Sequence, residues 1–303
     1  MPFRTLAAVT ALFVVAAPAT AQETLDLRAQ VAAFIKPTNA ERSQVVLDQL
    51  VAAGFEPVME PFEGGNRQTG AVEGLNIVVT FGGHGNEVEP EILLTAHYDA
   101  VVLRDGSLSH GVIDNAASVV GVIEAAKILR LKDLNHRVRV ILFDQEELGL
   151  IGARKWIEAH GLANVAAVVN SDVAAYGDTM MYGQNNGAQS AAVTRAVQAV
   201  CVERALQCVG YPEYPPSDDR AFSAAGAPVV SLGFQDQVGA HQMWLTFNGG
   251  EMTGLAEGFV PQVFRLIHSA ADTMEHIDPA TVKTAGEVYA AVVERLDAQL
   301  AQR

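Results

Sequence analysis

The sequence predicts an α/β fold, a three-layer α/β/α sandwich with a central mixed, mostly parallel sheet. Short apolar runs alternate with amphipathic segments of roughly ten to fifteen residues, a pattern typical of strands joined by crossover helices. The chain has 303 residues, of which 50% are apolar and 18% charged, so it can form one full hydrophobic core. No internal repeat or low-complexity linker divides it, and we expect one domain.

Residues 1–21 have the pattern of a signal peptide. Arg4 supplies the positive charge, Leu6–Ala17 is an apolar run, and Ala19-Thr20-Ala21 is a small-residue cleavage site. A short membrane anchor is the alternative, but the run falls short of the roughly 20 residues that span a bilayer. We therefore expect cleavage after Ala21, export to the periplasm or the medium, and a mature domain over residues 22–303 with no membrane partner.

Periodicity and capping residues locate the helices. Thr38 and Glu41 form a capping box ahead of the second helix, and Gly54 follows its end. The stretch from Gln235 to Gly254 is rich in Gly and Gln, and we expect an irregular segment there, either a loop over the site or an insertion. The predicted helices are Leu25–Ile35, Ala40–Ala53, Ala116–Leu129, Leu148–Ala159, Ala188–Val202, Leu255–Ile267 and Pro279–Leu300.

Short apolar runs, several of them β-branched, locate the strands. The segment holding Gly64, Gly65, Asn66 and Gly70 is predicted to be a turn-rich lead-in to the first of them. The predicted strands are Leu75–Phe81, Ile92–Ala96, Val138–Phe143, Val165–Val169, Thr179–Tyr182 and Val229–Leu232.

The charge and the cysteines restrict the possible partners and compartment. A formal charge of −15 disfavours binding to nucleic acid and to anionic lipid, and it suits substrates that carry an ammonium group. The two cysteines, Cys201 and Cys208, have no second Cys or His pair at zinc-finger spacing. An oxidising compartment favours a disulfide between them, and two reduced, buried thiols are the alternative.

Potential metal ligands follow several predicted strands. A lone histidine or carboxylate at such a position is more often a surface pair, a turn residue or a helix cap. Here the groups recur at the carboxyl ends of successive strands, where an open α/β sheet gathers its functional residues. Imidazole and carboxylate are both good zinc ligands. The residues are His97, Asp99, Asp114, Glu146, Glu147, Asp172 and His268.

The order of these motifs resembles that of the co-catalytic di-zinc aminopeptidases, of the bacterial leucyl type and the aminopeptidase Y type. The resemblance extends from Leu75 to Asp278 and implies a zinc-exopeptidase-like fold. Its motifs are His97-x-Asp99, Asp114-Asn115-Ala116, Glu146-Glu147-x-Gly149-Leu150-x-Gly152, Ser171-Asp172, Ser217-Asp218 and His268-x-x-x-Asp272-Thr273.

The resemblance implies roles for individual residues in removing the N-terminal residue of peptides that have a free N-terminus. It implies two zinc ions per chain, with Asp114 as the carboxylate shared between them. Glu146 would be the general base, and Asp99 would orient the ring of His97. The remaining ligands would be His97 and Asp172 for one ion, and Glu147 and His268 for the other.

The sequence departs from the family pattern at a few positions. Asp219 stands where relatives carry a histidine, and His110 lies in a loop where relatives carry a Pro-Gly-Ala type segment, either as a site residue or as a solvated one. Tyr211 and Tyr214 could donate a hydroxyl to the substrate oxyanion or serve as loop aromatics. An apolar substrate pocket is another possibility, and its candidates are Met243, Trp244 and Phe247.

Two alternatives compete with an aminopeptidase. One is a glutaminyl cyclase on the same scaffold, which would use a single zinc ion, and the other is an inactive relative that serves as a binding module. Neither fits as well, because no ligand and no general base is missing. The preferred N-terminal residue, the metal used in the cell and the oligomeric state stay open, with a monomer favoured.

Overall fold

The computed structural model describes residues 19–83, 90–251 and 253–302. Most of the predicted signal peptide therefore lies outside the described residues. Helix α1 (Ala19–Ala32) begins at the last three residues of that prediction. Within the described ranges, no helix is both long and apolar enough to cross a membrane.

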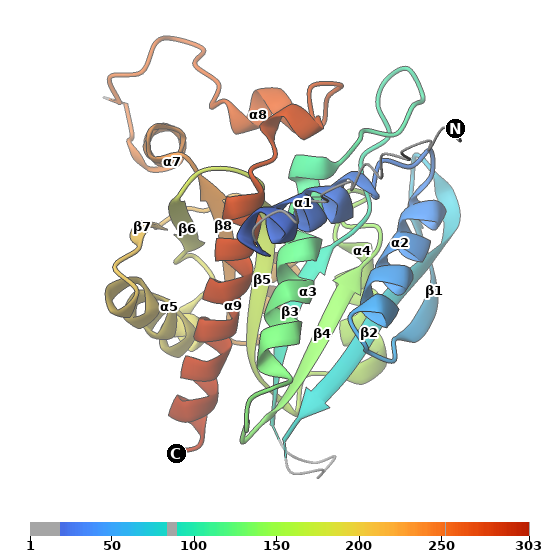
Figure 1. Cartoon of the computed structure of the whole chain (residues 1–303). Helices are drawn as coiled ribbons and strands as arrows, with labels where there is room; N and C mark the ends of the chain where they lie inside the picture. The colour runs from blue at the N-terminus through green and yellow to red at the C-terminus, as the bar shows by residue number, and fades with distance from the viewer. Residues whose placement is uncertain (1–18, 84–89, 252, 303) are drawn as a thin grey trace, which may run out of the picture.

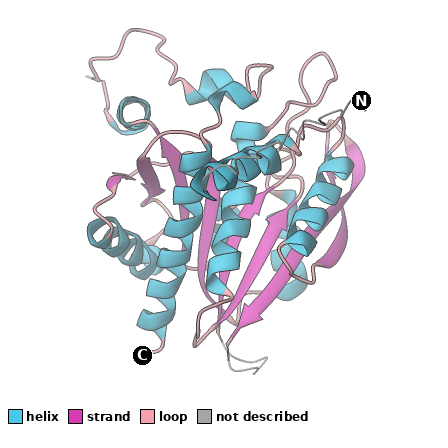
Figure 2. Ribbon diagram, viewed as in Figure 1, coloured by secondary structure: helices cyan, strands magenta, loops and turns pink. Residues whose placement is uncertain are grey.

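The centre of the molecule is one mixed sheet of eight strands, in the order β1-β2-β4-β3-β5-β8-β6-β7. Strands β4, β3, β5 and β8 run parallel to one another, and antiparallel pairings join this central block to β2 on one side and β6 on the other. Figure 2 shows the sheet between helices. The strands are β1 (Val58–Asn66), β2 (Gly70–Gly82), β3 (Glu91–His97), β4 (Arg137–Phe143), β5 (Val165–Ala174), β6 (Thr179–Gly183), β7 (Gln207–Tyr211) and β8 (Val229–Gln235).

Helices cover both faces of the sheet because successive strand residues alternate between two cores. Val79 points into the larger core, under α1, α2, α3, α5 and α9, whereas Val78 points into a second core with Trp156 of α4 and Phe222 of α6. The helices over the larger core lie in front of the sheet in Figure 1. The longer helices are α2 (Asn39–Ala52), α3 (Ala117–Leu129), α4 (Ile151–His160), α5 (Ala191–Glu203), α7 (Gln237–Asn248) and α9 (Pro279–Leu300), and the short ones are α6 (Asp219–Ala224) and α8 (Val263–Leu266). The three-layer α/β/α prediction is confirmed.

Three predictions about local structure are wrong. The turn-rich segment before β2 is strand β1, which pairs with β2 through a tight hairpin. The segment from Gln235 to Gly254 is mostly helix α7, whose first turn is capped by the Asp236 side chain accepting from the Gly239 N–H. The predicted helix Leu255–Ile267 is helical only over α8, at its C-terminal end, and His268 follows directly after the Ile267 cap.

Cys201 near the end of α5 and Cys208 on β7 form a disulfide. The bridge ties a helix of the outer layer to an edge strand of the sheet. The prediction of a disulfide is thus confirmed.

Candidate metal centre

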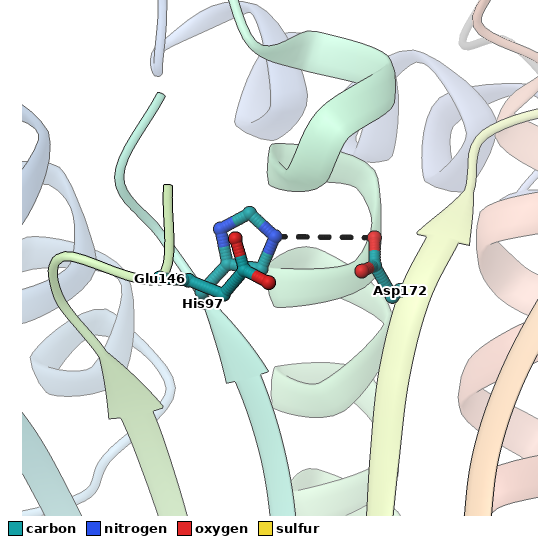
Figure 3. A group of neighbouring side chains, drawn as sticks. All are labelled: His97, Glu146 and Asp172. Carbon is teal, nitrogen blue, oxygen red and sulfur yellow. Dashed lines mark ion pairs between the residues drawn. The ribbon is translucent and has the colours of Figure 1, made fainter. Parts of the chain in front are cut away.

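The carboxyl ends of neighbouring parallel strands bring most of the predicted site residues together. His97 is the last residue of β3, and Asp172 lies near the end of β5, which pairs with β3. Glu146 and Glu147 follow β4, on the other side of β3. Figure 3 shows the side chains of His97, Glu146 and Asp172 at this edge.

The potential ligands form two groups. In one, atoms of His97, Glu146 and Asp172 all lie within 4.8 Å of one another. In the other, the same holds for Asp114, Glu147 and His268. Each group therefore has one imidazole and two carboxylates, a donor set that suits a zinc ion.

Asp114 lies between the two histidines. Its Oδ1 atom is 3.2 Å from Nε2 of His97, and its Oδ2 atom is 3.1 Å from Nε2 of His268. Nε2 of His97 also lies 3.9 Å from Oδ1 of Asp172, and Nε2 of His268 lies 3.1 Å from Oε2 of Glu147. One carboxylate thus presents an oxygen to each half of the centre.

Asp99 supports both halves from behind. Its Oδ1 atom lies 3.3 Å from Nδ1 of His97, on the opposite side of the ring from Asp114. The same carboxylate accepts hydrogen bonds from the backbone N–H groups of Glu146 (3.1 Å) and Glu147 (3.2 Å). Asp99 therefore fixes the imidazole and the two glutamates relative to one another.

The loop that carries Asp114 is held by a second carboxylate. Asp272 accepts hydrogen bonds from the backbone N–H groups of Val112 (3.0 Å), Ile113 (2.7 Å) and Asp114 (3.2 Å). Burial raises the pKa of Asp272 to about 6, although the N–H groups favour its charged form. The sequence included Asp272 only as part of a motif, without a role.

Sequence reasoning missed Arg42. This arginine of α2 is fully buried and donates to the carbonyl oxygens of Tyr98 (2.6 Å), Phe34 (2.9 Å), His110 (2.8 Å) and Gly111 (3.0 Å). It thereby joins the segment after β3 to the loop before Asp114. An arginine on an amphipathic helix is usually solvated, so the sequence pattern held no signal for this contact.

The Ser-Asp motif places two buried carboxylates beside the centre. Asp219 accepts from the Ser217 N–H (3.0 Å) and from Nδ2 of Asn186 (2.8 Å), so it holds the turn that carries Asp218. Neither oxygen of Asp218 has a hydrogen-bond partner among the described residues. Burial raises the pKa of Asp218 to about 8.

The remaining candidates divide between the site and the scaffold. His110 is exposed, and its side chain belongs to neither ligand group. The Tyr211 hydroxyl donates to the Ala240 carbonyl, whereas Tyr214 lines a cavity beside the centre. Of the three apolar candidates only Met243 lines that cavity; Trp244 donates to the Gly210 carbonyl, and Phe247 packs on Phe264.

Electrostatics favour a cation between these groups. Burial, together with the nearby charge of Asp114, raises the pKa of Glu147 to about 7. Hydrogen bonds to Asp114 and Glu147 raise the pKa of His268 to about 11. So many buried carboxylates repel one another unless protons or metal ions offset their charge.

Unpartnered polar atoms point to the same conclusion. Nε2 of His97, Oε1 of Glu147 and Oδ1 of Asp172 are among the buried atoms of the described residues that lack a hydrogen bond. Buried polar atoms normally have partners, and these three side chains all come from the two ligand groups. The residues present therefore fit metal ions.

A cavity of about 450 Å³ adjoins the centre. Asp114, Glu146, Asp172 and His268 form its polar end. Its other walls are largely apolar and include Val173, Met181, Tyr214, Met243, Val263, Phe264 and Ile267. The centre thus opens onto a compartment with the size and character of a small-ligand pocket.

Known structures share this fold. A Zn-dependent exopeptidase from Parabacteroides distasonis superposes with a TM-score of 0.68 at 17% identity, over 90% of this chain and 97% of the other. BSAP, a zinc aminopeptidase from Bacillus subtilis, gives 0.56 at 20% identity, over 72% of this chain and 49% of the other. A Bacteroides thetaiotaomicron glutaminyl cyclase superposes with a TM-score of 0.69 at 15% identity, over 90% of this chain and 96% of the other. At these identities the likeness concerns the fold alone.

Sequence comparison extends the likeness to a family. A vacuolar membrane protease of Schizosaccharomyces pombe is 30% identical over 159 residues. That match covers 52% of this chain and only 17% of the relative. Residues 76–293, which include all the candidate ligands, match the family model described as Peptidase family M28. The chain belongs to peptidase family M28.

Proposed function

We propose that this protein is a zinc aminopeptidase, which hydrolyses the N-terminal peptide bond of peptides with a free N-terminus. The observation that carries the proposal is the position of Asp114, whose two oxygens face the two ligand groups. A carboxylate in this position can bind two metal ions at once, whereas a single ion in either group would use only one of its two oxygens.

The proposed ligands divide between two zinc ions. His97 and Asp172 would hold one ion, Glu147 and His268 the other, and Asp114 both. When bound, the pair of ions would lower the pKa of a water and polarise the scissile carbonyl.

Glu146 is the proposed general base. It lines the cavity of about 450 Å³ together with Asp172 and Asp114, and burial holds its pKa well above the usual carboxyl range. Its carboxylate would take a proton from the attacking water and pass it to the amide nitrogen as the C–N bond breaks. Asp99 would keep Glu146 in place through the Glu146 N–H.

The cavity of about 450 Å³ supports an exopeptidase with an apolar first residue. Val173, Met181 and Met243 among its walls suit an apolar side chain, such as Leu, Met or Phe. The carboxylates at its polar end would attract the α-ammonium group of the substrate.

A glutaminyl cyclase is the second candidate. The observation in its favour is that the cyclase fold matches nearly the whole of both chains, whereas BSAP matches half of its own length. A cyclase would need one zinc ion, held by Asp114, Glu147 and His268, and the paired arrangement of His97 and Asp172 would then have no role.

We further propose that the protein acts outside the cytoplasm, as an exported chain. The predicted signal peptide and the Cys201–Cys208 disulfide support this compartment, because reducing conditions in the cytoplasm disfavour disulfides.

The test compares two reactions on purified protein loaded with zinc. Release of p-nitroaniline from leucine p-nitroanilide is measured beside ring closure of an N-terminal glutamine, in the wild type and in Glu146→Gln. We expect amine release that a chelator abolishes, and a loss of roughly 10²–10⁴-fold in kcat for the variant at unchanged zinc content. Ring closure without amine release would replace the aminopeptidase with the cyclase.

A further inference from the structure

A second and larger cavity lies on the other side of the metal centre. It measures about 950 Å³ and is bounded by the first turns of α2, the β1–β2 hairpin and the segments that follow β3 and β4. Figure 1 shows α2 beside β1 and β2 at one edge of the molecule. No step of the proposed chemistry uses this space.

The centre separates the two cavities. Glu146 lines the smaller one, and the adjacent Glu147 lines the larger one together with Asp99. A peptide whose first side chain fills the smaller cavity would have its scissile bond at the centre. The residues after that bond would then lie next to the larger cavity.

The lining of the larger cavity is acidic. Its ionisable side chains, apart from Tyr98, are all carboxylates, and it includes no Lys, Arg or His. Asp144 is already engaged, since it accepts from the N–H groups of Leu75 (3.1 Å) and Gln145 (2.9 Å). The other acidic side chains are Glu63, Glu73, Asp99 and Glu147.

Glu63 and Glu73 lie directly opposite each other in the antiparallel β1–β2 pair, so their side chains share one face of the hairpin. Both are exposed, and neither forms a hydrogen bond or an ion pair with another described residue. Like charges in this arrangement destabilise a hairpin, and a cation placed between them would remove that cost.

A buried atom at the inner end of the cavity has no partner either. Oε1 of Glu147 lacks a hydrogen-bond partner among the described residues, and only 7% of the side chain is exposed. Because the proposed zinc centre uses Glu147, the carboxylates left for a substrate are Glu63 and Glu73 at the outer end of the cavity.

We propose that this cavity binds the leaving side of the peptide and selects a lysine or arginine in the first or second residue after the scissile bond. Glu63 and Glu73 would bind the cationic side chain. The inference rests on the proposed aminopeptidase function and adds a substrate class to it.

Matched peptides test the preference. Leu-Lys-Ala-Ala and Leu-Ala-Lys-Ala are compared with analogues that carry Gln or Glu in place of Lys, and kcat/KM is measured for each. We expect about a fivefold advantage of Lys over Gln at one of the two positions, and a further loss for Glu. The advantage should shrink as salt is added, because the glutamates are exposed.

Variants locate the preference. For each protein, kcat/KM for the Lys peptide is divided by kcat/KM for the Gln peptide. A change in the fraction of folded protein alters both values equally and leaves their ratio unchanged. The double variant Glu63→Gln/Glu73→Gln should bring the ratio close to one. Glu56→Gln is the matched control: Glu56 is an exposed glutamate outside the cavity, and its removal should leave the ratio unchanged.

Leucine p-nitroanilide separates failure of this inference from failure of the proposed function. If it is hydrolysed but Lys, Gln and Glu peptides are equivalent, the cavity does not select charge and the inference is wrong. The inference is also wrong if the double variant keeps the wild-type ratio. If neither the anilide nor any peptide is cleaved, the aminopeptidase proposal fails, and the inference fails with it.

Discussion

At the scale of single residues, Asp272 positions the metal centre without belonging to it. It contacts the backbone of the Asp114 loop through three N–H groups and is 1% exposed. Asn can accept the same bonds at only one oxygen and brings two donors that find no acceptor among those groups. The orientation of Asp114 therefore depends on the charge and shape of Asp272.

We predict that Asp272→Asn weakens zinc binding about 10–100-fold and lowers the free energy of unfolding by roughly 1–3 kcal/mol. Competition with a chelator of known affinity measures the first effect, and urea unfolding of the metal-free protein measures the second. Asp178→Asn is the control, because Asp178 is exposed and contacts only Thr179. Wild-type zinc affinity in Asp272→Asn would contradict this role.

The sequence indicated the residues of the centre better than it indicated their supports. His97, Asp114 and Glu147 belong to ordered motifs at strand ends, and the structure brings them to one edge of the sheet. Arg42 belongs to no motif, because its four contacts are carbonyl oxygens that any residue supplies. A hydrogen bond to a backbone carbonyl does not depend on the side chain of the partner residue, so no sequence motif marks it.

At the scale of elements, helix α9 is hydrogen-bonded to the loop before β4. Asp297 accepts hydrogen bonds from the Asn135 N–H (3.1 Å), the Asn135 side chain (2.8 Å) and the His136 N–H (2.7 Å), and it lies 2.8 Å from Nδ1 of His136. Burial alone would raise the pKa of Asp297, but these bonds outweigh it and lower the pKa. A pKa lowered by folding means that the charged form stabilises the folded protein above the unfolded pKa, and that this stabilisation is lost as the pH falls through the folded pKa.

We therefore predict that Asp297→Asn costs about 1–3 kcal/mol of unfolding free energy at pH 7 and that the difference from the wild type narrows below about pH 4. Urea unfolding of both proteins at a series of pH values measures this difference in unfolding free energy. Asp133 lies in the same loop but is exposed and has no described partner. Asp133→Asn should therefore have the unfolding free energy of the wild type at every pH. A difference that is constant with pH would show that the charge of Asp297 is not the cause.

The disulfide joins a second pair of elements. Cys201 and Cys208 are seven residues apart, so the bridge closes a short loop between α5 and β7. For a loop of this length, restriction of the unfolded chain corresponds to about 2–3 kcal/mol. We predict that Cys201→Ser/Cys208→Ser lowers stability by up to this amount and keeps zinc content unchanged, as measured by unfolding and by metal analysis. An unchanged stability would mean that strain in the bridge cancels the entropic gain.

Elements with a clear apolar period were predictable, and those without one were not. Strand β3 and the second half of β4, residues 140–143, have nearly continuous apolar runs because both of their faces are buried. Strand β1 ends in Gly64, Gly65 and Asn66, and none of its residues is buried, so its sequence has no alternation of apolar and polar residues. Helix α7 buries only Gly239, Ala240 and Met243, so its sequence has little amphipathic pattern.

At the scale of the whole molecule, acidity serves two purposes. The formal charge is −15, and many of the acidic side chains gather at one edge of the sheet, where two cavities meet the centre. Surface carboxylates would favour solubility and would attract the cationic peptides proposed as substrates. Buried carboxylates at the centre repel one another, and bound cations would relieve that repulsion.

Zinc stoichiometry tests the two-ion centre most directly. Purified protein is stripped with a chelator, reloaded with zinc and passed through a desalting column, and the bound metal is measured per chain in the wild type and in Asp114→Asn. We expect two zinc ions per wild-type chain and weaker retention of both in the variant, because Asp114 faces both ligand groups. A single ion per wild-type chain, retained at full affinity after His97→Ala, would contradict it and favour a one-ion enzyme.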